Sequence, residues 1–239
     1  MTDPVFRSIC AHTSTNTVFG HIRAASGETA ISVFNCHPFP FGRWCFMHNG
    51  GIAHFNRIKK EMVKIISDEA FDLVKGTTDT EHLAALFFTN LEKTKGAKSW
   101  EETHSLHEVK HTLETTIHQI LEIQRRVVAP SAPEASSLNV AITDGEQLLT
   151  IRFRNHPLEE PPSLYISTTA GVALNRKFPG HPDKAGQDNG GGELKQADEH
   201  GDHVIVTGEP TTFNLADWQL IPKNKCIMVG RDKIGRAHV

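Results

Sequence analysis

Three short segments of the chain carry residue types that could act together in chemistry. They contain Arg23, the pair Asn49-Gly50, and Asp79. An arginine can form a bidentate pair with a carboxylate, an asparagine amide can donate hydrogen bonds, and an aspartate can accept them from a cation. Each also has an ordinary structural interpretation: Arg23 as a surface ion-pair partner, Asn49-Gly50 as a tight turn, and Asp79 as an acid at a helix start. The residue types alone leave both interpretations open.

Local patterns predict the elements that position these residues. The sequence at 18–27 predicts a short buried strand that runs into a turn, and 44–52 predicts an apolar strand that ends in an Asn-Gly turn. Apolar residues at three- and four-residue spacing predict a helix from Phe55. Thr78 with Glu81 matches a capping box and predicts the start of another helix.

The second half of the chain has a different pattern. Residues 101–128 predict one amphipathic helix, which with its following loop forms an insertion at 101–137. Residues 138–154 predict a β-hairpin. Prolines and glycines predict a loop at 35–43 and a long, flexible loop at 177–201. Further strands are predicted at 163–167, 203–207 and 222–229. Strand groups with helices between them favour a layered αβ sandwich.

Composition excludes several classes of protein. The net charge of -3 gives no warrant for a nucleic-acid partner or an anionic membrane surface. No apolar run approaches the ~20 residues of a membrane span, and no secretory signal is visible. The four cysteines form no CxxC pair, which favours reduced thiols and a cytoplasmic protein.

In order and spacing, the segments 20–26, 47–52 and 78–82 resemble those of class II glutamine amidotransferases, N-terminal-nucleophile hydrolases that take ammonia from glutamine. The amino-acid sequence most resembles the fungal amidotransferase component of a glutathione-degrading complex, in the segments 35–39, 43–52, 77–82, 152–157, 161–165 and 217–222. The resemblance runs from about Val18 to Val229. It implies one domain at 1–233 with an α+β fold, the four-layer αββα sandwich of these hydrolases.

The resemblance also implies roles for the residues. Arg23 would bind the substrate α-carboxylate, Asp79 the α-ammonium group, and the Asn49 amide with the Gly50 N–H the oxyanion. The substrate would be a γ-glutamyl amide, either glutamine or glutathione cut at its γ-glutamyl–cysteine bond, with no cofactor and no metal. A metallopeptidase-like partner subunit is implied too. The helix within 101–128 is a candidate surface for it, unless its apolar face packs on its own domain.

The sequence departs from the family at the nucleophile, which should be an N-terminal cysteine. The chain begins at Met1, and neither Thr2 nor Cys10 matches that position. Residues 234–239 look like a translated sequencing adapter, and so predict a non-native tail. We therefore expect a fragment that lacks its first strand or strands, is poorly soluble and has no glutaminase activity.

Two other functions compete with this hypothesis. The first is a non-catalytic, truncated form that binds a partner or a γ-glutamyl ligand. The second is a metal-dependent hydrolase, suggested only by the 15 histidines, whose spacing gives no HExxH motif. His21, His37 and His48 are expected to be structural, although His48 could instead position the Asn-Gly turn by hydrogen bonding.

Overall fold

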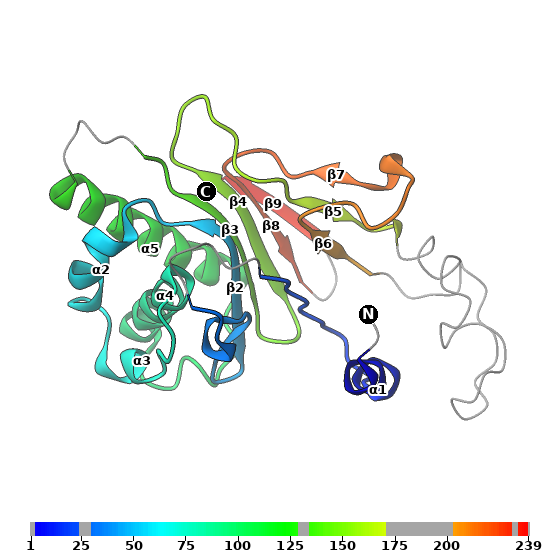
Figure 1. The fold of residues 1–239 in the computed structure, drawn as a ribbon, viewed down its shortest axis with the longest axis horizontal. Coiled ribbons are helices and arrows are strands. Elements are labelled where there is room, and N and C mark those ends of the chain that lie inside the picture. The colour runs from blue at the N-terminus through cyan, green and yellow to red at the C-terminus, as the bar shows by residue number, and fades with distance from the viewer. Residues whose placement is uncertain (1–2, 24–29, 129–133, 171–202, 231–233, 239) are drawn as a thin grey trace.

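The computed structural model describes residues 3–23, 30–128, 134–170, 203–230 and 234–238. These residues form three layers: a group of helices, a large sheet, and a small sheet on the face of the large sheet away from the helices (Figure 1). The helix α1 (Pro4–His12) lies apart from the layers, and a segment without regular structure leads from it back to the large sheet (Figure 1). The predicted α+β class is confirmed, and the fourth layer of the predicted sandwich stays a prediction.

The helix layer contains α2 (Phe55–Val63), α3 (Asp68–Asp72), α4 (Asp79–Lys95) and α5 (Leu106–Val127). Side-chain caps explain where three of them begin. Ser67, Thr78 and Ser105 each accept a backbone N–H from the first turn of α3, α4 and α5 respectively. Gly96 ends α4 with its N–H on the carbonyl of Glu92. The predicted helices from Phe55 and within 101–128 are thus confirmed.

All strands pair antiparallel. The large sheet has the order β1-β2-β3-β4-β8-β9, and the small sheet has the order β6-β5-β7. The strands of the large sheet are β1 (Phe39–Phe41), β2 (Trp44–Gly51), β3 (Ser137–Thr143), β4 (Leu148–Arg154), β8 (Lys225–Val229) and β9 (Ile234–His238). Those of the small sheet are β5 (Tyr165–Ser167), β6 (Ile205–Thr207) and β7 (Gln219–Leu220). Two short 3₁₀ turns complete the described elements, at Val33–Asn35 and Leu215–Asp217.

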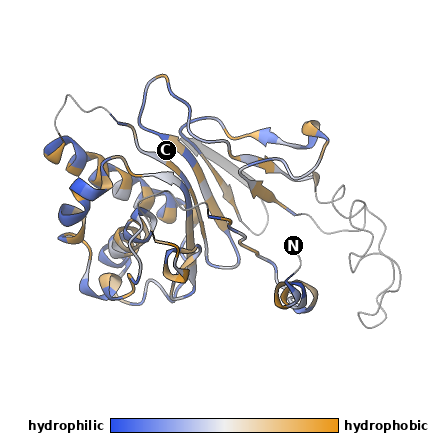
Figure 2. Ribbon diagram, in the orientation of Figure 1, coloured by the Kyte–Doolittle hydropathy of each residue, from blue (hydrophilic) through white to orange (hydrophobic). Residues whose placement is uncertain are grey.

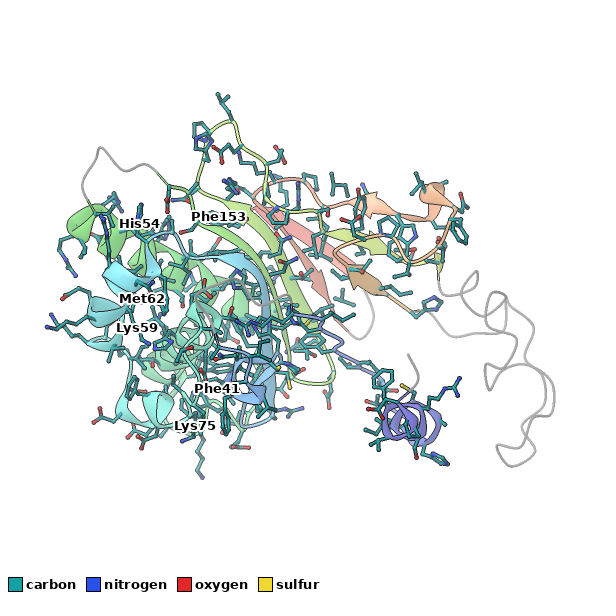
Figure 3. The ribbon with its side chains drawn as sticks, viewed as in Figure 1. Phe41, His54, Lys59, Met62, Lys75 and Phe153 are labelled. Carbon is teal, nitrogen blue, oxygen red and sulfur yellow. The ribbon has the colours of Figure 1, made fainter. Side chains whose placement is uncertain are left out.

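The main core lies between the helices and the large sheet. The helices α2 and α5 mix polar and apolar residues, as expected for helices with one buried face (Figure 2). In contrast, α4 is buried on all sides from Thr80 to Leu91. Phe41, Met62 and Phe153, which Figure 3 labels, belong to this core. A smaller cluster joins the two sheets through Leu164, Ile166, Ile221 and Ile227. This cluster covers part of the face of the large sheet that lies away from the helices.

A buried arginine ties the small sheet to the large one. Arg152 of β4 donates to the carbonyl oxygens of Pro161 (2.9 Å), Pro162 (2.9 Å) and Ile221 (3.1 Å). Its neighbour across the strands, Asn139 of β3, donates to the carbonyl oxygen of Pro162 as well (3.0 Å). Together these side chains fix the segment that leads into β5.

The predicted strand at 18–27 is wrong where the structure describes it. Residues 18–23 form no strand, and the side chains of Val18 and Ile22 are 75% and 90% exposed. A side-chain hydrogen bond anchors the start of this segment instead: the hydroxyl of Thr17 donates to the carbonyl oxygen of Gly145 (2.8 Å). Residues 24–27 of that prediction lie outside the described residues.

Two other local predictions need correction. The sequence 44–52 does not end in an Asn-Gly turn, because β2 continues through Asn49, Gly50 and Gly51 and pairs with β3 throughout. Residues 35–43 are not all loop, because Phe39–Phe41 forms β1. In both cases pairing with a neighbouring strand overrides the local turn signal.

The capping box at α4 is only half formed. Thr78 caps the N–H of Glu81 as predicted, but Glu81 does not return to the backbone of Thr78. Its carboxylate instead accepts the N–H groups of Lys75 (2.6 Å) and Gly76 (2.7 Å). Glu81 therefore holds the turn that precedes the helix.

The other sequence predictions have mixed outcomes. The hairpin at 138–154 and the strands within 163–167, 203–207 and 222–229 are confirmed. The predicted loop at 177–201 lies outside the described residues. Residues 234–238, predicted to belong to a non-native tail, pair as β9 with β8, and their origin stays a prediction.

Candidate active site

One large cavity collects the residues that the sequence singled out. It has a volume of about 1550 Å³ and is lined by the N-terminal segment, the end of β2, the start of α4, and parts of β3, β4 and β6. Arg23, Asn49, Gly50 and Asp79 all lie on its wall. Residues up to 56 positions apart in sequence thus share one cavity. Their individual roles stay predictions.

Asn49 and Gly50 stand at the end of β2, opposite Asn139 and Leu138 of β3. The backbone of Gly50 has φ +143°, and a Cβ added there would lie 2.0 Å from the carbonyl oxygen of Ser137. Only glycine allows the two strands to approach this closely. The strand therefore presents an exposed carboxamide next to a backbone that no side chain shields.

His48 links this strand end to α4. Its buried ring lies with Nδ1 2.9 Å from the Thr80 hydroxyl and Nε2 3.1 Å from the carbonyl oxygen of Ser137. Because a carbonyl only accepts, Nε2 carries the proton and Nδ1 accepts from Thr80. Burial lowers the pKa of His48, and the nearby Asp79 charge opposes that shift. The sequence left two interpretations of His48 open, and the structure combines them: a buried histidine that positions β2 by hydrogen bonding.

Asp79 is held firmly at the first position of α4. Its Oδ2 accepts the N–H of Ile52 (2.8 Å), and its Oδ1 accepts the N–H of Thr80 (2.8 Å). The positive end of the helix dipole stabilises its charge there. Each carboxylate oxygen can accept more than one hydrogen bond, so Asp79 can also receive a ligand cation.

Arg23 approaches the cavity from the N-terminal segment. Its Nη1 donates to the carbonyl oxygen of Ala30 (3.4 Å). His21 and His37 lie beside it with ring centroids 4.1 Å apart, and both line the cavity. Burial lowers the pKa of both rings, that of His37 to about 3, with help from neighbouring positive groups. At neutral pH these two rings add no positive charge to that of Arg23.

Sequence reasoning missed several residues of this wall. His21 and His37 were expected to be mostly structural, and Asn139 was not singled out, yet all three line the cavity. The hairpin predicted at 138–154 places Asn139 opposite Arg152 on the adjacent strand. That pattern predicts that the two residues are neighbours, but it does not predict a cavity. No motif spacing in the sequence brings these residues together.

No cysteine lies among the described residues that line the cavity. All four cysteines fall in the described ranges, and none of them forms a disulfide bond: Cys10 lies on α1, Cys36 after the 3₁₀ turn, Cys45 on β2, and Cys226 is buried in β8. Burial raises the pKa of Cys45, which disfavours its thiolate. Within the described ranges, no group of three or more histidine, cysteine or acidic residues could hold a metal ion.

A comparison with curated proteins found a relative of similar sequence. The chain is 30% identical over 229 residues to the probable glutamine amidotransferase DUG3 of Saccharomyces cerevisiae, covering 95% of this chain and 60% of that protein. The chain thus spans less than two thirds of that relative's length. No family profile matches the chain.

Two solved structures were also similar. A glutamine aminotransferase class-II domain protein from Silicibacter pomeroyi aligns with a TM-score of 0.59 at 20% identity, over 99% of this chain and 80% of that one. A predicted glutamine amidotransferase from Pseudomonas aeruginosa aligns with a TM-score of 0.48 at 19% identity, over 84% and 65% of the two chains. The first of these similarities supports the fold. In sequence, the chain is similar to the yeast probable glutamine amidotransferase over 95% of its own length.

Proposed function

We propose that the cavity binds a γ-glutamyl amide, such as glutamine or the γ-glutamyl end of glutathione. The observation that carries the proposal is the convergence of Arg23, Asn49, Gly50 and Asp79 on one wall. An α-amino acid presents a carboxylate and an ammonium group on one carbon. A cation and an anion on the same wall complement that pair.

The amide end of the ligand would meet β2. Amide hydrolysis passes through a tetrahedral intermediate with a developing oxyanion, which convergent N–H donors stabilise. The Asn49 carboxamide and the Gly50 backbone are adjacent, and the Thr80–His48–Ser137 hydrogen bonds hold their strand. An oxyanion donor of this kind is worth about 10²–10³ in kcat.

The size of the cavity supports substrates larger than glutamine. Its volume of about 1550 Å³ exceeds the ~300–1,000 Å³ typical of small-molecule pockets. The wall near β6 and the start of β4 adds residues such as Leu148 and Val206 beyond the four proposed ligand-binding groups. A peptide-like leaving group therefore has room, and the two charged groups serve glutamine and glutathione equally.

The described cavity wall supports binding more than turnover. The proposed chemistry needs a thiol that attacks the amide carbon, and the described wall carries none. We therefore propose that this chain binds γ-glutamyl ligands without hydrolysing them. The second candidate function, a ligand- or partner-binding module, is favoured by the same observation.

The partner and the compartment are supported less directly. The apolar face of α5 packs against its own domain through Val109, Leu113, Ile117, Ile120 and Ile123. A metallopeptidase-like partner subunit is a proposal that rests on the family resemblance. Four cysteines that form no disulfide bond support the proposal of a cytoplasmic location. Among the described helices, none combines the length and apolar character needed to cross a bilayer.

The test is calorimetric titration of the full chain with L-glutamine, beside assays of ammonia release. We expect saturable binding that R23M and D79N each weaken by about 10–100-fold, because each removes a charge-assisted hydrogen bond worth ~1.5–3 kcal/mol. R125M is the matched control, since Arg125 lies exposed on α5, away from the cavity wall, where it pairs with Glu122 and donates to the carbonyl oxygen of Leu121. Equal affinity of R23M, D79N and R125M for glutamine would refute the proposed site, and ammonia release by the wild type would refute the absence of turnover.

A further inference from the structure

A buried asparagine outside the cavity wall connects the two charged groups of the site. Asn35 ends the 3₁₀ turn Val33–Asn35 and is only 2% exposed. Its Nδ2 donates to the carbonyl oxygen of Ala30 (2.9 Å), and its Oδ1 accepts the N–H of Thr77 (2.9 Å). One side chain thus joins the backbone at Ala30 and at Thr77, which lie 47 residues apart in sequence.

The first of these segments leads to Arg23. The carbonyl oxygen of Ala30 accepts from Nη1 of Arg23 (3.4 Å) as well as from Nδ2 of Asn35. Both donors therefore share one acceptor, whose position Asn35 fixes through the shorter bond. A shift of Ala30 would therefore alter this contact of the guanidinium group.

The second segment leads to Asp79. Thr77 precedes the N-cap residue Thr78, and Asp79 follows as the first residue of α4. The turn before Thr77 has little room to move, because a Cβ on Gly76 would lie 2.3 Å from Oδ1 of Asn35. Glu81 secures the same turn from the other side through the N–H of Gly76 (2.7 Å). Asn35 therefore fixes the backbone that leads into Asp79.

We infer that Asn35 is a positioning residue, which holds Arg23 and Asp79 in fixed relation so that both can bind one α-amino acid group. It does not itself line the cavity and acts only through Ala30 and Thr77. Ligands that need both charges are then recognised by a pair of groups fixed before binding, which lowers the entropic cost of the complex. The inference rests on the proposed function, because it assigns Arg23 and Asp79 to the two ends of the same ligand group.

The experiment measures how much the α-amino group and the α-carboxylate of the ligand each contribute to affinity, with and without Asn35. The full chain is titrated with L-glutamine, with 5-amino-5-oxopentanoic acid, which lacks the α-amino group, and with 4-aminobutanamide, which lacks the α-carboxylate. We expect the wild type to lose about tenfold or more in affinity with either truncated ligand. In N35A both losses should shrink to about threefold or less, since neither charged group is held in place.

Two further variants make the test specific. N35D keeps an oxygen for Thr77 but loses the donor to Ala30, so only the penalty for the missing carboxylate should shrink. N90A is the control for a buried asparagine, because Asn90 bridges α4 to Thr116 and Gln119 of α5 and does not line the cavity. It should retain both penalties even if it is less stable.

The outcomes separate the two proposals. Full wild-type penalties in both N35A and N35D would overturn the positioning role while leaving the proposed function intact. A wild-type protein that binds the three ligands equally would refute the proposed function, and the role of Asn35 with it. Loss of both penalties in N90A would show a general effect of instability and would also overturn the inference.

Discussion

Replacing Gly50 by alanine tests the close approach of β2 and β3 at the site. The added Cβ would lie 2.0 Å from the Ser137 carbonyl oxygen and 2.9 Å from Nε2 of His48, and the residue would keep φ +143°. Favourable carbon contacts lie near ~3.5–4.0 Å, so the strands must separate by more than an ångström. That movement breaks the His48–Ser137 bond and the pairing at Gly50 and Gly51.

The size of the effect follows from these losses. A non-glycine residue in a sparsely populated backbone region costs about 1–3 kcal/mol. Two or three lost hydrogen bonds add about 1 kcal/mol each, and the smaller entropy of the unfolded chain returns less than 1 kcal/mol. G50A should therefore lower the free energy of unfolding by about 3–5 kcal/mol.

Urea denaturation followed by circular dichroism measures this change, and two glycines provide controls. Gly145 has φ +91° with nothing within 4 Å of an added Cβ, so G145A should show only the backbone cost of about 1–3 kcal/mol. Gly20 has neither a positive φ nor a close neighbour, and G20A should change stability little. If G50A unfolds at the same urea concentration as G145A, the argument from close approach is refuted.

Two other expectations concern stability. R152K should lower the free energy of unfolding by about 2–3 kcal/mol in urea denaturation, because an ammonium group cannot reach the three carbonyls and Glu160 that the planar guanidinium joins. The control R154K should lower it by under 1 kcal/mol, because Arg154 pairs with the exposed Glu159. A similar loss in both variants would contradict this. Burial lowers the folded-state pKa of His48 and His82 below 6.5, so the unfolded chain binds more protons below that pH. The urea midpoint should fall as pH drops from 7.5 to 5, and a midpoint that rises would contradict the account.

Periodic patterns allowed most elements to be predicted from the sequence. The helical spacing after Phe55 and within 101–128 corresponds to α2 and α5, and the hairpin at 138–154 corresponds to β3 and β4. These segments bury one face against a continuous core, so pattern and packing agree. Local signals failed where tertiary contacts decide the structure. Asn49-Gly50 has the sequence of a turn but pairs as a strand.

The candidate site was predicted in part. The grouping of Arg23, Asn49, Gly50 and Asp79 in one cavity was expected from family resemblance, and no spacing rule would have produced it. Asn35 carried no such signal, because its role depends on backbone atoms of Ala30 and Thr77. Any residue type can supply those atoms, so the sequence does not reveal the partners.

The central claim is that this cavity binds the α-amino acid end of a γ-glutamyl amide. The most direct measurement is a titration of the ¹⁵N-labelled full chain with L-glutamine, followed by amide chemical shifts. The account predicts saturable shifts gathered at Arg23, Asn49, Gly50 and Asp79, which R23M and D79N reduce at equal ligand concentration. Saturable shifts located elsewhere, or no shifts at a millimolar excess of ligand, would contradict it.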